Sequence, residues 1–223
     1  MIDAIRHDDT KFAEALLSHG LPLHPDYALE AAKWKATNVL EVLLKNGFDI
    51  NKPISDGQLP VLGHIAQDQD MVLWLLRHGA DLNQTCLIDL TPLSYAVHYA
   101  PISNIKLFLD NGGDTQQGQL LFHALNREAE VIEVLTLLLK EGAPLNGTLY
   151  QNHPLSRSLY AFMGLGTILH KAAKLGKVDV VRFLVCEGVD LSIKDANGNT
   201  ALDCARERGK IEVVPLLEGS TDH

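Results

Sequence analysis

The chain has 223 residues, enough for one large domain or two small ones. Hydrophobic residues make up 46% of it and charged residues 21%, close to globular averages, which excludes a disordered or fibrous chain. Nineteen basic residues stand against 28 acidic ones, a formal net charge of −9. Because such a field repels phosphate backbones, we do not expect nucleic acid as a partner.

The cysteines and the apolar runs indicate the cellular setting. Cys86, Cys186 and Cys204 are odd in number and lack any Cys-x-x-Cys spacing, so we expect free thiols in a reducing compartment. The sequence begins without the apolar stretch of a signal peptide, and it contains no run of 18 uncharged apolar residues. We therefore expect an intracellular protein, cytoplasmic or nuclear, that does not bind a membrane.

An internal repeat runs along the whole chain. Two bulky apolar residues, two polar residues and a glycine recur seven times, often followed by aspartate and asparagine. The glycines of the seven copies are Gly20, Gly47, Gly79, Gly112, Gly142, Gly188 and Gly219, with successive spacings of 27, 32, 33, 30, 46 and 31 residues. A second pattern lies upstream of the glycine, most clearly at Thr91-Pro92-Leu93, Thr167-Ile168-Leu169-His170 and Thr200-Ala201-Leu202-Asp203.

Each copy predicts a pair of helices. The threonine caps the first helix, and proline is tolerated directly after such a cap. The first helix is rich in alanine, which permits close helix contacts, and the second, for example residues 178–185, is apolar on most sides. Such a helix must be covered by neighbours on both flanks. The glycine then suits the left-handed residue that ends the helix.

Both patterns together resemble the ankyrin-repeat family, whose period is 33 residues and whose signature is Thr-Pro-Leu-His-x-Ala. The resemblance covers nearly the whole chain and implies an all-α solenoid of about seven helix-turn-helix repeats with β-turn or hairpin fingers. It predicts a single ankyrin-repeat domain over residues 1–219, and both ends have the polar character of caps, as expected of a complete short solenoid. The expected repeats are 1–22, 23–54, 55–86, 87–116, 117–146, 163–195 and 196–219, with an insert at 147–162 and a frayed tail at 220–223.

The insert accounts for the long glycine spacing of 46 residues. It is too apolar for a plain linker, and two interpretations stay open. It packs on the stack as a longer hairpin, or its aromatic residues form part of a surface for a ligand or partner. Its candidate binding residues are Tyr150, His153, Tyr160 and Phe162.

Motifs for catalysis are missing from the sequence. His64, His123 and His170 lie near the signature histidine, which in similar proteins forms hydrogen bonds within and between neighbouring turns. No metal-binding histidine pair, phosphate-binding loop or Gly-x-Ser-x-Gly turn is present. We therefore expect no enzyme activity, no cofactor and no metal.

The resemblance implies recognition of another protein through the turn tips and the ends of the first helices, which line a concave face. The residues at those positions are Trp34, Lys35, Gln67, His98, Tyr99, Asn126, Arg127, Lys174, Leu175 and Arg208. Tryptophan, tyrosine and arginine dominate interface energies, so Trp34, Tyr99 and Arg127 are the strongest candidates, although each could be an ordinary surface residue.

Charge is unevenly distributed along the chain. Residues 167–210 hold 8 basic and 6 acidic residues, whereas residues 1–166 hold 11 basic and 19 acidic ones. The basic segment is either an ordinary solvated helix face or a surface that binds an acidic peptide.

The sequence thus favours a monomeric, non-catalytic adaptor or scaffold that binds a partner protein. The alternative is a small-molecule binder or enzyme with a pocket between the concave groove and the insert. In that alternative the polar groups come from His98, Tyr99, Tyr150, His153 and Tyr160. A third hypothesis is a regulatory partner in an oligomer.

Overall fold

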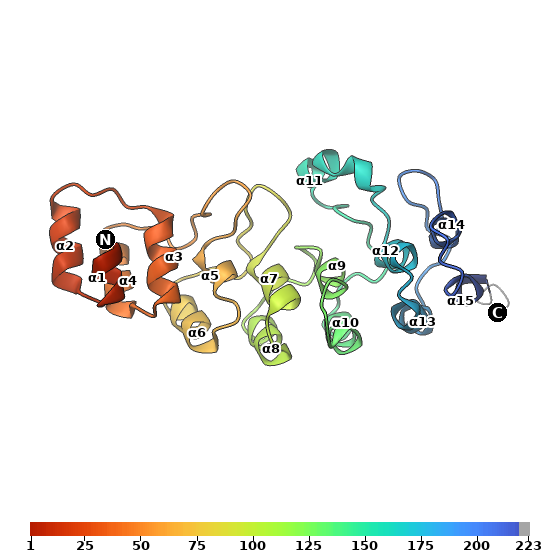
Figure 1. Cartoon of the computed structure of the whole chain (residues 1–223), viewed down its shortest axis with the longest axis horizontal. Helices are drawn as coiled ribbons and strands as arrows, with labels where there is room; N and C mark the ends of the chain where they lie inside the picture. Colours follow the sequence, from red (N-terminus) through yellow and green to blue (C-terminus); the bar gives the residue numbers. More distant parts are fainter. Residues whose placement is uncertain (219–223) are drawn as a thin grey trace. The chain divides into compact units, whose positions relative to one another are not determined.

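A computed structural model of the chain describes residues 1–218. These residues form fifteen α-helices and one short 3₁₀-helix, and beyond two isolated antiparallel bridges they contain no β-structure (Figure 1). The predicted all-α fold of paired helices is confirmed. The described residues fall into two compact units, one of residues 1–114 and one that begins at residue 115. The single domain 1–219 and its repeat boundaries stay predictions, and the tail 220–223 lies outside the described residues.

The first unit stacks four helix pairs. In it α1 packs against α3, α3 against α5 and α5 against α7, while α2 packs against α4 in a second layer. Alanine makes the close contact of the first helices possible, since Ala28, Ala31 and Ala96 are 0% exposed. The helices are α1 (Ile2–Arg6), α2 (Thr10–Ser18), α3 (Pro25–Lys33), α4 (Thr37–Lys45), α5 (Val61–His64), α6 (Gln69–Arg77), α7 (Pro92–Tyr99) and α8 (Ile102–Asp110).

The second unit repeats this arrangement with three helix pairs and the insert. Its first helices α9, α12 and α14 pack in that order, and α10, α13 and α15 form the second layer. Among the part of the chain that the structure describes, no helix is long and apolar enough to cross a bilayer. The helices are α9 (Leu120–Ala124), α10 (Val131–Lys140), α11 (Pro154–Leu159), η1 (Ala161–Met163), α12 (Ile168–Leu175), α13 (Val178–Cys186), α14 (Ala201–Glu207) and α15 (Val214–Glu218).

Threonine is the N-cap of the first helices α7, α12 and α14, as the sequence predicts. The hydroxyl of Thr91 accepts a hydrogen bond from the Ser94 N–H at 3.3 Å, and the Thr91 N–H donates to the Ser94 hydroxyl at 3.1 Å. Thr200 and Asp203 form the same reciprocal pair at α14, at 3.2 and 2.9 Å. Two otherwise unpaired N–H groups are satisfied at each helix start.

After the second helices α2, α4, α6, α8, α10 and α13, the recurring glycine has a left-handed conformation that ends the helix. Gly79, after α6, has φ +88°, and the next N–H, that of Ala80, donates to the carbonyl of Leu75 at 3.0 Å. Val189 and Leu184 repeat this bond at 3.1 Å after α13. A side chain at the glycine position would strain the backbone, which explains the regular spacing of this residue.

Asparagines at the end of the repeated pattern connect successive turns. Asn51 donates through Nδ2 to the Gly79 carbonyl at 2.9 Å, and its Oδ1 accepts from the Asp81 N–H at 2.7 Å. Across the insert, Asn146 Oδ1 accepts from the Asp190 N–H at 2.9 Å. The insert therefore leaves the connection between the flanking turns intact.

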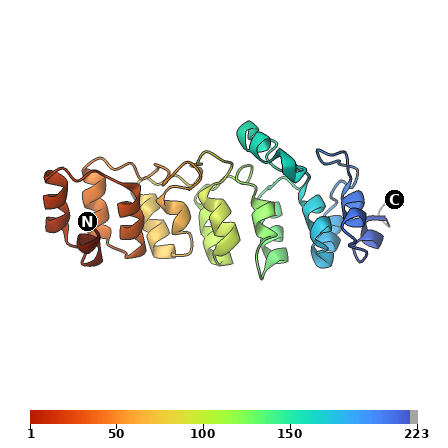
Figure 2. The ribbon, with the colours of Figure 1, turned by 45° about the horizontal axis from the view of Figure 1, so that its top comes forward.

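The insert, together with residues 163–166 that connect it to α12, extends from the second unit as a separate arm that contains α11 and η1 (Figure 2). Its two ends are joined by an antiparallel bridge between Thr148 and Thr167 and by a 3.0 Å hydrogen bond from the Leu149 N–H to the Gly166 carbonyl. Leu149 is 8% exposed, whereas Phe162 is 83% exposed. One part of the insert packs on the stack, and another part presents apolar surface to solvent.

Replacement of Leu184 by alanine is expected to reduce the free energy of unfolding by about 2–5 kcal/mol, because the side chain is 0% exposed and its loss leaves a cavity. Urea unfolding followed by circular dichroism measures the change. Ile211→Ala is the control, since Ile211 is 75% exposed and its replacement should change stability by less than about 0.5 kcal/mol. Equal effects of the two replacements would show that the core assignment is wrong.

Candidate binding site

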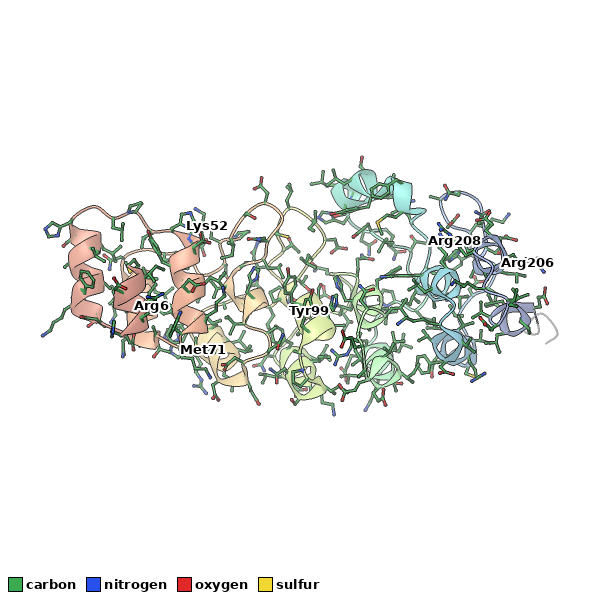
Figure 3. All side chains as sticks on the ribbon, in the orientation of Figure 1. Arg6, Lys52, Met71, Tyr99, Arg206 and Arg208 are labelled. Carbon is green, nitrogen blue, oxygen red and sulfur yellow. The ribbon has the colours of Figure 1, made fainter. Side chains whose placement is uncertain are left out.

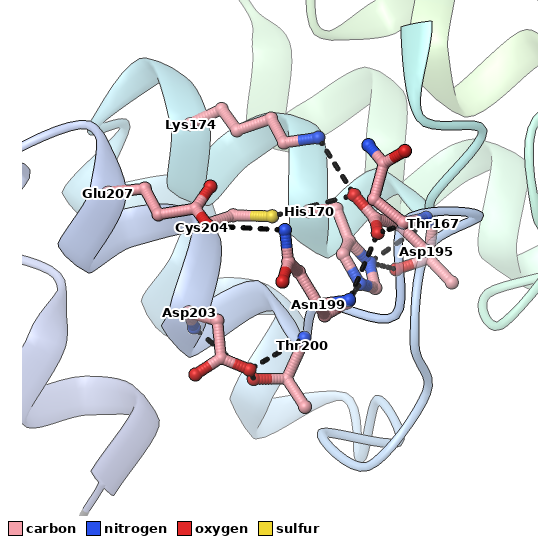
Figure 4. Close-up of polar contacts among 10 residues, drawn as sticks. Thr167, His170, Lys174, Asp195, Asn199, Thr200, Asp203, Cys204 and Glu207 are labelled. Atoms are coloured by element: carbon pink, nitrogen blue, oxygen red, sulfur yellow. Dashed lines mark hydrogen bonds and ion pairs between the residues drawn. The ribbon is translucent and has the colours of Figure 1, made fainter. Parts of the chain in front are cut away.

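The buried carboxylate of Asp195 joins its own turn to α12 and α14 (Figure 4). Asp195 Oδ1 accepts hydrogen bonds from the N–H groups of Asn197 at 2.9 Å and Asn199 at 3.1 Å. Its Oδ2 accepts from Lys174 Nζ at 3.1 Å, and the Cys204 thiol donates to it at 3.7 Å. Burial opposes ionisation of Asp195, but the hydrogen bonds outweigh it and lower its pKa. The carboxylate is therefore ionised and fixes the turn in place.

His170 of α12 also binds the turn that holds Asp195. Its Nδ1 accepts from the Thr167 N–H at 3.1 Å, so Nε2 carries the proton and donates to the Asn199 carbonyl at 3.1 Å. Burial lowers the pKa of His170, which keeps the ring neutral. The expected histidine bond to the next turn is thus present at His170.

The other two histidines near the signature do not share this position. His170 is the third residue after its N-cap, whereas His64 and His123 are the fourth residues after the N-caps Pro60 and Gln119. The third position holds glycine and phenylalanine in those helices, so His64 and His123 do not occupy the signature position. The His64 ring contacts the ring of Tyr95 edge to face, with 5.5 Å between centroids.

Two lysines connect α12 and the turn after it to the C-terminal end of α9. Lys171 Nζ donates to the Phe122 carbonyl at 3.3 Å and to Asn126 Oδ1 at 3.0 Å, and Lys177 Nζ donates to the Leu125 carbonyl at 3.0 Å. Cations suit this helix end, where carbonyls lack partners. Burial, assisted by the nearby charge of Lys177, lowers the pKa of Lys171.

A pocket of about 490 Å³ lies between α9, α12, the end of α14 and the insert, and it is open to solvent on one side. Lys171, Lys174 and Arg208 supply its cationic groups, and Figure 3 places Arg208 at α14. Its apolar lining consists of Phe122, Leu149, Met163 and Leu175, together with the ring of Tyr150. The size falls within the range of pockets that hold small ligands or side chains of a partner.

The candidate residues of the first unit lie at the ends of its first helices. Trp34 is 56% exposed, with the Arg6 guanidinium 5.9 Å from its ring centroid. Tyr99, at the end of α7, is 55% exposed and stacks on His98 at 4.0 Å (Figure 3). Gln67 is exposed. Lys35 forms a 2.6 Å ion pair with Asp68, the N-cap of α6, so its ammonium connects two repeats.

The pocket brings together several predicted residues of the second unit, namely Asn126, Tyr150, Lys174, Leu175 and Arg208. The remaining candidates have local structural contacts. The Arg127 side chain is only 9% exposed and pairs with Glu130 at 3.1 Å. His153 caps α11 by accepting from the Ser156 N–H at 3.1 Å, and Tyr160 stacks on Tyr150 at 5.1 Å.

Sequence reasoning missed Phe122, His123, Lys171 and Met163 as lining residues. Two of these residues could have been found from their position, because the residue directly after the signature position faces the pocket. Lys171 and His123 both occupy that position, counted from their N-caps, and both face the pocket.

The described residues contain no cluster of three or more histidine, cysteine, aspartate or glutamate side chains able to hold a metal ion. Cys86 and Cys204 are buried and Cys186 is exposed, all as free thiols. The arrangement of cations beside apolar side chains is suited to binding.

Comparisons with known proteins agree with the fold. Two family models of ankyrin repeats match residues 28–119 and 169–218, which together cover more than half of the chain. The chain is 33% identical to the putative ankyrin repeat protein FPV244 of fowlpox virus, over 55% of this chain and 19% of the relative. It is 25% identical to the ankyrin repeat and KH domain-containing protein mask-1 of Caenorhabditis elegans, over 97% of this chain and 10% of the relative. The chain thus spans at most about a fifth of these two relatives.

Among solved structures, the ankyrin repeat domain of Bcl-3, described as a unique member of the IkappaB protein family, is similar to this chain. The TM-score is 0.67 at 22% sequence identity, and the match covers 98% of this chain and 97% of that one. At this identity the likeness concerns the fold alone.

Replacement of Lys174 by methionine should lower the free energy of unfolding by about 1–3 kcal/mol, because the buried Asp195 carboxylate loses a charged donor. Chemical denaturation measures the loss. Arg182→Met is the matched control, since the Arg182–Asp179 pair is exposed at 59% and 86% and contributes less than about 1 kcal/mol. A loss at Lys174 no larger than that of the control would contradict the structural role of this ion pair.

Stability should also decrease in mild acid. Because burial lowers the pKa of His170 below its ordinary value of 6.5, the unfolded chain takes up a proton before the folded protein does. The contribution of His170 is complete above about pH 6.5 and is lost as the pH falls from there toward the folded pKa. Urea midpoints between pH 7.5 and 5 should decrease less steeply for His170→Gln than for the wild type, and parallel slopes would refute this.

Proposed function

The chain belongs to the ankyrin-repeat family, and on that premise we propose that it is a non-catalytic adaptor or scaffold that binds a partner protein through the ends of its first helices. Ankyrin repeats are in general protein–protein interaction modules. The compartment and the monomeric state stay predictions from the sequence.

One observation carries the proposal. Large apolar residues recur at the end of the first helix in three different repeats and stay about half exposed: Trp34 at 56%, Tyr99 at 55% and Leu175 at 50%. The helices that hold them are fixed by caps and buried alanines. Aromatic residues held in this way lose little conformational freedom on binding, which favours affinity.

Removal of the two aromatic rings tests this proposal. The double variant Trp34→Ala/Tyr99→Ala should lose a partner that the intact protein retains in affinity capture. With that partner purified, calorimetry should show affinity about thirtyfold weaker, the effect of losing a dominant contact of about 2 kcal/mol. Arg127 is omitted from the variant because its side chain is largely covered and paired with Glu130.

The control replaces equally exposed apolar residues elsewhere in the same unit. Phe12→Ala/Leu87→Ala removes side chains that are 45% and 53% exposed and lie outside the ends of the first helices. If both double variants weaken binding equally, or neither does, the proposed surface is wrong.

A further inference from the structure

The pocket of the second unit combines positive charge with apolar walls. Lys171, Lys174 and Arg208 line it, and its lining contains no aspartate or glutamate. This is unusual in a chain of net charge −9. A ligand that carries a negative charge beside an apolar group would match both features.

The three cations are not equivalent. Lys174 is held by the buried Asp195, and Lys171 donates to Phe122 and Asn126 while its ammonium lies 5.8 Å from the Phe122 ring centroid. Arg208 is exposed, and its side chain forms no ion pair or hydrogen bond with the described residues. Its guanidinium is thus available for a direct, two-point bond to a carboxylate.

The nearby charges favour such a bond. Lys171 is partly desolvated and lies near Lys177, and both effects lower its pKa, so a carboxylate in the pocket would relieve the mutual repulsion. Two acidic residues that contact or neighbour these cations are already engaged. Asp195 is bound by Lys174, and Glu207 accepts from the Asn199 side chain at 3.3 Å.

The surface beside the pocket indicates a polypeptide. Met163 lines the pocket, and the insert that precedes it carries exposed apolar side chains: Leu155 at 42%, Leu159 at 51% and Phe162 at 83%. An enclosed small molecule would leave these side chains in water. An extended chain that enters the pocket and crosses the insert would cover them.

We propose that this pocket binds a segment of a partner protein in which an aspartate or glutamate lies next to a large apolar residue. The carboxylate pairs with Arg208 in the field of Lys171 and Lys174. The apolar side chain enters between Phe122, Met163 and Leu175, and the segment continues over Phe162. This inference rests on the proposed function and specifies the chemistry of one contact.

The test begins with selection of random linear peptides displayed on phage, using the intact 223-residue protein as bait. Selected peptides should share an acidic residue beside a large apolar one. Affinities of the synthetic peptides are then measured by fluorescence anisotropy. Arg208→Glu should weaken binding about tenfold or more, as expected when a charge-assisted bond is replaced by repulsion.

Two matched controls isolate the site. Lys194→Glu makes the same charge change in the same unit at an exposed residue outside the pocket, and it should alter affinity less than about twofold. Phe162→Ser should weaken binding several-fold, whereas Ile211→Ser, at a residue 75% exposed, should not. Changing the acidic residue of the peptide to its amide should cost affinity on the wild type and little on Arg208→Glu.

Other outcomes overturn the inference. Peptides that depend on Trp34 and Tyr99 but are insensitive to Arg208→Glu would refute the pocket and leave the proposed function standing. 3-Phenylpropionate bound as tightly as the selected peptides would show a small-molecule site instead. If selection yields no binding peptide and affinity capture yields no partner sensitive to Trp34→Ala/Tyr99→Ala, both the inference and the proposed function fail.

Discussion

Direct contact between successive first helices is the constraint on which the structure depends. These helices have five to nine residues, apart from the four-residue α5, and are too short to persist alone in water. They persist because alanines such as Ala31, Ala96 and Ala172 are 0% exposed and let neighbouring backbones approach. Each repeat is therefore stabilised mainly by its neighbours, and the helix ends fall into register within each unit.

The same contacts make the pocket a preformed site. The Ala196 N–H donates to the Gly164 carbonyl at 2.7 Å, which ties the end of the insert to the turn that holds Asp195. Lys174 and Cys204 attach that turn to α12 and α14. Because the turn around this buried carboxylate is attached to three walls of the pocket, little conformational freedom remains to be lost on binding.

The sequence predicts the fold well, because its determinants are local. Caps at Thr91 and Thr200 and the left-handed Gly79 act within a few residues, so their spacing is sufficient to place the helix pairs. The site is less predictable because it depends on distant contacts. No local pattern indicates that Lys171 caps α9, 49 residues from Phe122, or that the Arg127 side chain is covered. The sequence does indicate that His123 lies outside the signature position. It follows Leu121 by two residues, whereas the signature histidine follows its leucine directly.

The net negative charge of the chain repels an acidic partner, while the cations of the pocket attract it. Which effect dominates depends on the distance between the partner and the pocket. At physiological salt, charges beyond about 8 Å are largely screened, so the net −9 acts on the approach and the pocket cations act on the bound state. Added salt weakens both the repulsion and the attraction, and the two changes partly cancel. A simple salt titration therefore cannot separate them. Reversal of the charge at Arg208, compared with the same reversal at Lys194, changes the local field by itself, because the net charge of the two variants is identical.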